Sequence, residues 1–377
     1  MRNTCVISGL SPGFGGVPRL LEFLKQYNEV ITPRRDKIYS SIKILHKALM
    51  LISWIRQILS TSSQRVTIIH HFSIPTIVLI LIAVRFRKVH YFAIDNSFFC
   101  IKSYNHKFGS PCLDCVGANV PLQYTQSCLS FPNKKSRLSL KMEGILIAYW
   151  VKNNDSYALS ESSAKLMRKH FSDSKNVEVL NFSTLELRDC INDTQIIENG
   201  RTFKKVSKVH KYNFVFHGSA HEAKGYDYSI KLAEKLPEFT FLFPFLLKPE
   251  QQRLKNCFWI DMTWTNGLKE LVVSADCVLC PSQWSYTPEA AMLKSLIYNE
   301  AVLYMETSGS FSDDIPANVG IRASGRISTD VKRLKHHMEF VEAKTMERKG
   351  RDFVIKFVEN FESQFTIPKS ETNYFLG

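Results

Sequence analysis

One lysine in the second half of the chain stands where a cation can act on a phosphate. The apolar run Phe214–His217 has the pattern of a buried strand, and the loop GSAHEAKG, which begins at Gly218 and contains Ser219 and Lys224, follows it. Ligands of parallel α/β sheets bind at the carboxyl ends of the strands, so we expect this loop to contact a diphosphate. A solvated lysine in a plain connecting loop would give the same pattern.

A carboxylate follows another strand at a comparable place. The buried run Cys277–Cys280 ends in Pro281-Ser282, and an irregular loop then enters a helix near Pro288. Glu289 suits two roles there. It can accept hydrogen bonds from hydroxyl groups of a donor sugar or ribose, or it can favour the start of the helix. The spacing leaves both roles open.

The first half has a glycine-rich loop and a pair of histidines at strand ends. The first candidate strand runs into GLSPGFGG, where main-chain amides near Gly15 and Gly16 can approach an anion. A connecting turn is an equally good interpretation, and Pro18 occupies the third glycine position of the dinucleotide-binding pattern, which is therefore not met. His70 and His71 end a later strand, at the edge of the sheet where ligands bind.

Four cysteines form a cluster that is separate from these loops. Cys112 and Cys115 have zinc-ligand spacing, and with Cys100 and Cys128 they can complete a tetrahedral structural site. Buried free thiols are the alternative. Four thiolates leave no open position on the metal, so we expect no catalytic metal. The odd total of nine cysteines and the absence of a signal-peptide pattern predict a reducing, cytoplasmic setting.

Short β-rich runs alternate with helical patterns, which predicts parallel sheets joined by right-handed crossovers. We expect strands at Thr4–Ser8, Val66–His70, Val89–Phe92, Ser156–Leu159, Val177–Leu180, Tyr212–His217, Thr240–Phe243, Cys257–Ile260, Cys277–Cys280 and Ala301–Met305. Two such series predict two Rossmann-like domains, at residues 1–190 and 212–345, on either side of a polar stretch. Residues 346–377 would carry an amphipathic helix that crosses back to the first domain.

With these motifs in this order, the chain resembles the family 4 glycosyltransferases, which are retaining enzymes of the GT-B fold. The stretches similar to family motifs are Gly15–Arg19, Leu159–Glu161, Val177–Asn181, Gly218–Gly225 and Ala275–Ser282 with the helix after it. The resemblance implies an α/β fold of two Rossmann-like domains that face each other across a cleft.

The resemblance also implies an activity: transfer of a sugar from a nucleotide-sugar donor to a glycan or lipid-linked acceptor, with retention and no cofactor required for catalysis. Bacterial O-antigen, capsule or exopolysaccharide synthesis would be the setting. Lys224, amides near Gly15 and Gly16, and the helix start near Pro288 would stabilise the leaving diphosphate, while Glu289 would orient the donor.

In the first domain, the loop that usually carries the family's histidine keeps Asp95 instead. Asp95 or His71 would therefore contact the donor sugar or the acceptor hydroxyl.

The sequence departs from the family pattern at several site positions. Ser219 replaces the usual arginine of the phosphate loop, and the two glutamates of the E-x7-E motif fall at Tyr286 and Lys294. Asn299 replaces a glycine after that helix. A catalytically inactive GT-B partner subunit is therefore an alternative function.

Positive charge is concentrated in the first half of the chain. The net charge is +14, and residues 1–190 carry 25 Lys and Arg against 12 Asp and Glu. Residues 31–60 combine the bases Arg34, Arg35, Lys43 and Lys47 with an apolar stripe at Ile42, Leu45, Leu49 and Ile52, and with Trp54. We expect the first domain to dock on an anionic membrane at its inner face without spanning it. An ordinary helix packed on its own sheet is the alternative.

Two further interpretations follow from the same charges and hydropathy. The apolar stretch 66–84 is interrupted by histidines and a proline, so we expect a buried strand followed by a core helix rather than a membrane span. A nucleic-acid-binding protein with a zinc ribbon would place Lys and Arg beside exposed aromatic residues in a recognition motif. The basic residues here are scattered through α/β elements, so we expect no nucleic-acid partner.

Overall fold

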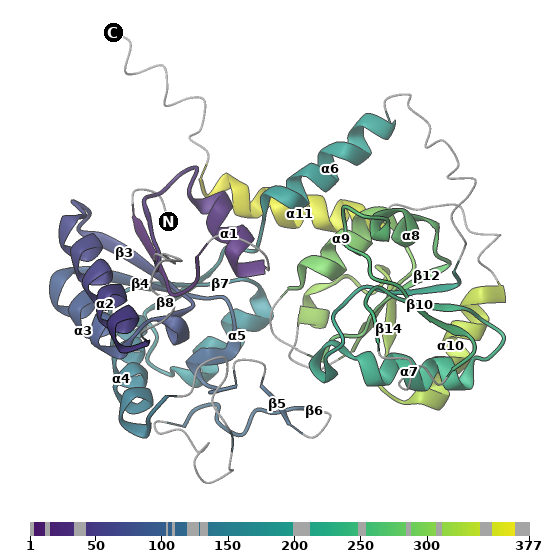
Figure 1. The fold of residues 1–377 in the computed structure, drawn as a ribbon, viewed down its shortest axis with the longest axis horizontal. Coiled ribbons are helices and arrows are strands. Elements are labelled where there is room, and N and C mark those ends of the chain that lie inside the picture. The colour runs from purple at the N-terminus through teal and green to yellow at the C-terminus, as the bar shows by residue number, and fades with distance from the viewer. Residues whose placement is uncertain are drawn as a thin grey trace. The chain divides into compact units, whose positions relative to one another are not determined.

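A computed structural model describes residues 4–11, 16–33, 43–102, 105–107, 110–118, 128, 135–198, 212–247, 254–283, 288–306, 311–339 and 349–365. The chain forms two compact units (Figure 1). Unit 1 contains Met1–Asn105, Cys112–Glu186 and Val358–Gly377, and unit 2 contains His106–Pro111 and Leu187–Phe357.

Unit 1 is built on a parallel sheet of six strands. Its strands are β1 (Cys5–Ser8), β2 (Val30–Ile31), β3 (Arg65–Ile69), β4 (Lys88–Ala93), β7 (Asp155–Ala158) and β8 (Asn176–Val179). Their order across the sheet is β2-β1-β3-β4-β7-β8. The direction of winding therefore reverses between β1 and β3, and ligands of open α/β sheets bind outside the carboxyl ends of the strands at such a point.

Unit 2 repeats this architecture with a second parallel sheet. Its strands are β9 (Phe214–Phe216), β10 (Phe241–Phe243), β11 (Cys257–Trp259), β12 (Cys277–Cys280), β13 (Val302–Met305) and β14 (Ile321–Ala323). The order β11-β10-β9-β12-β13-β14 is that of the Rossmann fold, with the reversal between β9 and β12. A small antiparallel pair, β5 (His106–Lys107) with β6 (Ser110–Pro111), completes the described strands.

Helices connect the strands in both units. In chain order they are α1 (Gly16–Leu24), α2 (Lys43–Ser60), α3 (Thr76–Arg85), α4 (Arg137–Asn153), α5 (Glu161–His170), α6 (Leu185–Glu198), α7 (Tyr226–Lys235), α8 (Leu268–Ser274), α9 (Ala290–Tyr298), α10 (Ile327–Glu339) and α11 (Lys349–Ser363). Side-chain caps fix several starts. The Ser160 hydroxyl, for example, accepts a hydrogen bond from the Ser163 amide at 3.2 Å at the start of α5.

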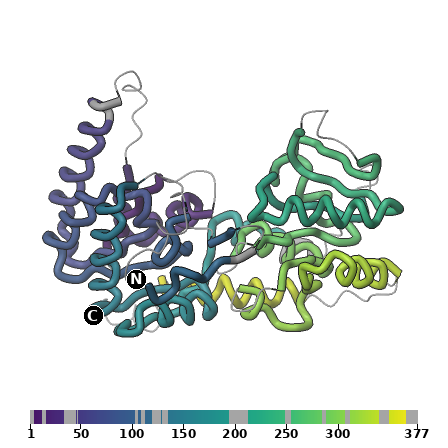
Figure 2. Tube along the Cα trace, turned by 90° about the horizontal axis from the view of Figure 1, so that it is seen from below, coloured from purple at the N-terminus to yellow at the C-terminus, as the bar shows by residue number. Residues whose placement is uncertain are grey.

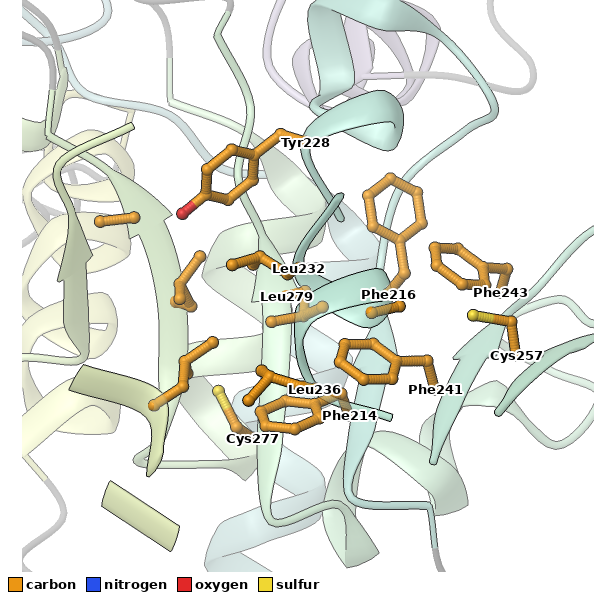
Figure 3. Packing of buried hydrophobic residues seen from close by; sticks show 14 of the residues in the cluster. Phe214, Phe216, Tyr228, Leu232, Leu236, Phe241, Phe243, Cys257, Cys277 and Leu279 are labelled. Carbon is orange, nitrogen blue, oxygen red and sulfur yellow. The ribbon is translucent and has the colours of Figure 1, made fainter. Parts of the chain in front are cut away.

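Aromatic rings fill the core of unit 2. The alternating phenylalanines of β9 and β10 point to one face of the sheet, where Phe214 and Phe241 stack at 4.6 Å and Phe216 and Phe243 lie 5.6 Å apart (Figure 3). Leu232 and other residues of α7 cover this cluster. Truncation of one such buried ring to alanine typically costs about 3–5 kcal/mol, so this layer fixes the strands that carry the loops described below.

Helices α2, α3 and α4 pack side by side in unit 1 (Figures 1 and 2). Helix α2 packs inward through Trp54 and Ile58, which are 1% and 0% exposed. Trp54 therefore does not lie at a membrane interface, as its place in the expected docking segment would suggest, because it is buried inside unit 1. The stretch 66–84 forms β3 and α3, as expected. None of the helices within the described ranges has both the length and the apolar character needed to cross a bilayer.

Candidate functional site

The switch point of unit 2 brings Lys224 and Glu289 together. The loop after β9 leads into a short 3-10 helix, Glu222–Lys224, and the loop after β12 leads to Glu289, immediately before α9. Lys224 Nζ lies 2.7 Å from Glu289 Oε1, and the Ser282 hydroxyl donates a hydrogen bond to the same oxygen. The two charged side chains are 22% and 15% exposed, so the pair is accessible to a ligand.

Gly225 lets the two loops meet. Its φ is 76°, in the left-handed region that glycine adopts without strain. A Cβ atom at this position would lie 2.1 Å from the carbonyl oxygen of Pro281. The amide of Gln283 donates to the Ala223 carbonyl at 2.9 Å, and the Ser282 hydroxyl oxygen lies 3.2 Å from the same carbonyl oxygen. A side chain at residue 225 would push apart the two loops that position Lys224 and Glu289.

Glu289 occupies the N-cap position of α9, but its side chain does not cap the helix. Helix α9 begins at Ala290, later than the sequence indicates, and the Glu289 side chain makes no capping hydrogen bond. Its carboxylate binds Lys224 and Ser282 instead. Pro288 is buried beside it. The side chain of Glu289 is therefore directed to the loops of the site, whatever its charge contributes to the helix start.

A buried group lies behind this pair, on the same edge of the sheet. The His217 ring stacks on Trp264 at 5.2 Å, and its Nδ1 lies 2.9 Å from the Ser295 hydroxyl. Burial lowers the pKa of His217 to about 3, with the Lys294 charge as a second cause, so the imidazole is neutral at pH 7. Lys294 is 6% exposed, and its ammonium lies 4.3 Å from the centre of the Trp264 ring.

The other expected residues of this half take varied positions. Gly218 is half-buried, and a Cβ there would lie 2.9 Å from the Phe216 ring, which a larger residue would have to displace. Ser219 is exposed. Tyr286, the counterpart of one family glutamate, lies outside the described residues. Lys294, the counterpart of the other, carries the opposite charge into a buried site.

In unit 1, His70 rather than His71 contacts Asp95. His70 has a φ of 50°, a left-handed conformation that typically costs a residue with a Cβ atom about 1–2 kcal/mol. Its Nε2 lies 3.4 Å from Asp95 Oδ2, while the buried Nδ1 has no hydrogen-bond partner among the described residues. Asp95 also accepts hydrogen bonds from the amide of Ser97, at 2.9 Å, and from its hydroxyl. Strain and an unsatisfied nitrogen in one residue are typical of functional sites.

His71 points into the unit instead. Its Nδ1 lies 3.0 Å from the Tyr91 hydroxyl and 3.4 Å from that of Ser97. Burial holds its pKa well below the usual value, with further lowering by Lys135 and His70. Side chains alternate in direction along a strand. Where the chain turns after the strand, this alternation no longer predicts which of two adjacent residues faces the site. Sequence alone therefore did not separate the roles of His70 and His71.

The glycine loop after β1 is described only in part. Gly15 lies outside the described residues, and a Cβ at Gly16, the first residue of α1, would meet nothing within 4 Å. Gly9 is the glycine that packing requires, because a Cβ there would lie 2.4 Å from the main-chain carbon of Ser73. The loops after β1 and β3 therefore touch at the switch point of this sheet.

The four clustered cysteines are not joined by disulfides. Burial raises the pKa of Cys100 to about 12, and the neighbouring Cys115 and Cys112 raise it further. Cys128 packs against a cluster that includes Phe72. Within the described part of the chain, no three His, Cys, Asp or Glu side chains gather closely enough to hold a metal ion. The structural zinc stays a prediction.

No family model and no curated protein matches the sequence. Solved structures do resemble the chain over nearly its whole length. Sucrose-phosphate synthase from Thermosynechococcus elongatus matches with a TM-score of 0.59 at 10% identity, covering 97% of this chain and 95% of its own. Anabaena HepE in complex with UDP matches with a TM-score of 0.59 at 12% identity, covering 99% and 100%.

A third neighbour has the same architecture. The UDP-forming α,α-trehalose-phosphate synthase from Burkholderia xenovorans matches with a TM-score of 0.54 at 9% identity and 97% coverage of both chains. The fold is GT-B. The sequence-based expectation of an α/β protein with two Rossmann-like domains is confirmed. At these identities, the likeness concerns the fold, and the activity has to be argued from the residues of the site.

Proposed function

We propose that this protein is a glycosyltransferase that takes a sugar from a nucleotide donor bound by unit 2. The observation that carries the proposal is the Lys224–Glu289 pair at the switch point between β9 and β12. This is the place in a Rossmann-like sheet where nucleotides bind. The GT-B neighbours support a nucleotide-sugar donor, since HepE was solved with UDP and with UDP-glucose.

Lys224 would act on the leaving group. In the transfer, the bond between the anomeric carbon and the phosphate oxygen breaks, and its electron pair leaves with the nucleoside diphosphate. The acceptor hydroxyl oxygen bonds to the anomeric carbon, and its proton passes to the leaving phosphate oxygen or to a basic side chain. A cation held in place beforehand stabilises the growing negative charge without having to reorganise. Glu289 and the loop geometry at Gly225 hold the Lys224 ammonium in that position.

A neutral His217 suits a donor site, because a protonated ring would place a second positive charge next to Lys294. The His217 ring also stacks on Trp264. Glu289 would also accept hydrogen bonds from hydroxyl groups of the donor, as the resemblance to family 4 enzymes implies.

Unit 1 would bind the acceptor. His70 and Asp95 lie together at the carboxyl end of β3 and β4, and His70 Nδ1 is the atom we assign to the acceptor hydroxyl, as hydrogen-bond partner or proton acceptor. Retention of the anomeric configuration and a role in bacterial surface-polysaccharide synthesis follow from the family resemblance and belong to this proposal.

We also propose that the outer face of unit 1 docks on an anionic membrane. Apolar residues are exposed at seven-residue spacing on three adjacent helices: Leu45, Ile52 and Leu59 on α2, Ile77 and Val84 on α3, and Leu138 and Ile145 on α4. The acidic residue of these three helices is Glu143, which is buried, while their sequences contain seven Lys and Arg residues. An apolar face bordered by bases fits the headgroup region of anionic lipids.

A catalytically inactive GT-B subunit is the second candidate. Lys294 favours it, because a buried ammonium stands where the family carries a carboxylate. Incubation with a panel of nucleotide sugars, followed by measurement of released nucleoside diphosphate, tests both candidates. Turnover with at least one donor supports the transferase. Tight nucleotide binding without turnover, with or without glycan and lipid acceptors, would favour the inactive subunit.

A further inference from the structure

Unit 1 contains a pocket of about 330 Å³ that the acceptor site described above does not use. One wall is the face of α4 that carries Leu140, Gly144 and Ile147. The opposite walls come from the segment after β4 and from the end of α5, and His71 and Phe72 contribute from the segment after β3. The pocket therefore adjoins the His70–Asp95 pair through His71 and Ser97.

Aromatic and aliphatic side chains dominate the lining. The apolar lining includes Phe72, Phe98, Phe99, Ile101, Leu140 and Phe171. If a methylene group takes about 30 Å³, the share of a water molecule in the liquid, the space holds roughly ten of them. Such a lining suits a hydrocarbon chain better than a sugar, because sugars need a hydrogen-bond partner for nearly every hydroxyl group.

The titratable groups that face the pocket are mostly uncharged or paired. Burial lowers the pKa of His170 to about 4 and holds that of His71 well below its usual value, so both rings are neutral at pH 7. Glu143 accepts hydrogen bonds from Lys135 at 2.7 Å and from Thr76 at 2.6 Å. Burial lowers the pKa of Lys135 and raises the pKa of Glu143, which favours the neutral form of each. The contact between the two side chains opposes both shifts.

One charge in the lining remains after this pairing. The exposed Lys141 lies one helical turn before Ile145 on the side of α4 that meets solvent. Ile145 both lines the pocket and is 54% exposed, so the apolar lining continues onto the exposed apolar face of α4. The pocket thus joins an apolar interior, an apolar approach from outside and a cation where the two meet.

We propose that this pocket binds the hydrocarbon chain of a lipid phosphate, with Lys141 beside the phosphate. Calling this ligand the acceptor rests on the proposed function, but its binding does not. The chain would enter between Ile145 and Lys141 and occupy the space beside Phe98, Phe99 and Phe171. The phosphate end would stay near solvent, where an ammonium can pair with it.

Gly144 offers a test with a matched control at one position. It is exposed on α4, and a Cβ there would meet nothing within 4 Å, so a larger side chain can be added without a clash at its base. Gly144→Ala adds a methyl group and favours the helix. Gly144→Phe fills the pocket, and Ala148→Phe fills it from the next turn, should the first variant fold poorly.

The probe is decyl monophosphate, whose chain of ten carbons matches the volume, at concentrations below micelle formation, titrated into the full chain by calorimetry. Decanol and inorganic phosphate serve as separate ligands. We expect wild type and Gly144→Ala to bind the probe. Gly144→Phe or Ala148→Phe should lower the affinity for the probe at least about tenfold. Lys141→Gln should weaken the binding of decyl monophosphate but leave the binding of decanol unchanged. Inorganic phosphate alone should not bind measurably.

Two results would overturn the proposal: no binding by the wild type, or equal binding by the folded pocket-filling variants. UDP titrated into the same proteins separates this outcome from the proposed function. UDP binding should be the same in all of them, because the substitutions lie in unit 1. A protein that binds the probe but no nucleotide would keep the pocket and reject the donor site.

Discussion

Lys224 and Glu289 are 65 positions apart in sequence, yet their side chains form a 2.7 Å ion pair that joins the loops after β9 and β12. The contact depends on Gly225, whose missing Cβ admits the Pro281 carbonyl. Two adjacent strands at a switch point thereby present one oriented cation. The predictions for unit 2 follow from this arrangement.

Lys224→Ala should lower turnover by about 10²–10³ while the protein stays folded, the usual effect of removing one charged stabiliser of a leaving group. Lys231→Ala is the matched control, since Lys231 is an exposed lysine of the neighbouring helix α7. Nucleoside diphosphate release under saturating donor measures the effect. Near-normal turnover in folded Lys224→Ala would remove this lysine from the site.

Glu289→Gln should reduce turnover about tenfold, because the amide keeps the shape of the side chain but has no charge with which to orient Lys224. The partly exposed pair should contribute only about 1 kcal/mol to stability. Combining this change with Lys224→Ala should cost less than the sum of the two, since both act on one interaction. Additive losses would show that the residues act independently.

Stability should fall as the pH is lowered from about 6.5 toward 4. His217 has a native pKa of about 3, so across this range its imidazole takes up a proton in the unfolded chain but stays neutral in the native state. The free energy of unfolding therefore decreases by up to about 1.4 kcal/mol per pH unit for each such histidine. His71 and His170 have lowered pKa values as well and add to the slope.

Urea unfolding at several pH values measures this slope. His217→Gln removes one titrating group and should flatten the dependence relative to wild type. His336→Gln is the control, because His336 is exposed on α10. An unchanged slope in His217→Gln would mean that the buried ring is protonated in the native protein.

The sequence predicts most of the fold because most central strands are short apolar runs of aliphatic and aromatic residues. All ten expected strands are present within one or two residues. In the two parallel sheets, the strands it missed are β2 at Val30–Ile31 and β14 at Ile321–Ala323, which are edge strands; it also missed the short antiparallel pair β5 and β6. An edge strand has one strand neighbour and is less buried, so its sequence carries a weaker apolar signal.

The sites were harder to predict than the sheets. The position of Lys224 after a strand indicated a ligand loop, but its partner depends on the close approach of two loops that no local pattern records. His70 is distinguished by a backbone torsion and by an unsatisfied nitrogen, and neither is visible in composition or spacing. The seven-residue rows on α3 and α4 become an exposed face only once the helices are packed.

The zinc prediction can be decided without activity. Protein purified without added metal should contain one zinc per chain if Cys100, Cys112, Cys115 and Cys128 are its ligands, and Cys112→Ser should remove it. Cys257→Ser, in the core of unit 2, is the control. Elemental analysis far below one zinc per chain, with four freely titratable thiols, would contradict the site.

Membrane docking should depend on the outward row of α2 and on charge. Ile52 is 59% exposed and Leu59 56%, so Ile52→Gln with Leu59→Gln removes apolar contact without touching the buried Trp54. We expect this double variant to lose sedimentation with anionic vesicles.

Neutralising Lys47 and Arg56 should also weaken binding, by about 1 kcal/mol for each base. Arg65→Gln, at the exposed start of β3, is the charge control. Wild-type binding should fall from low to high salt, because ions screen surface charge. If wild type fails to sediment at low salt, or if the double variant binds as wild type does, this face does not dock on membranes.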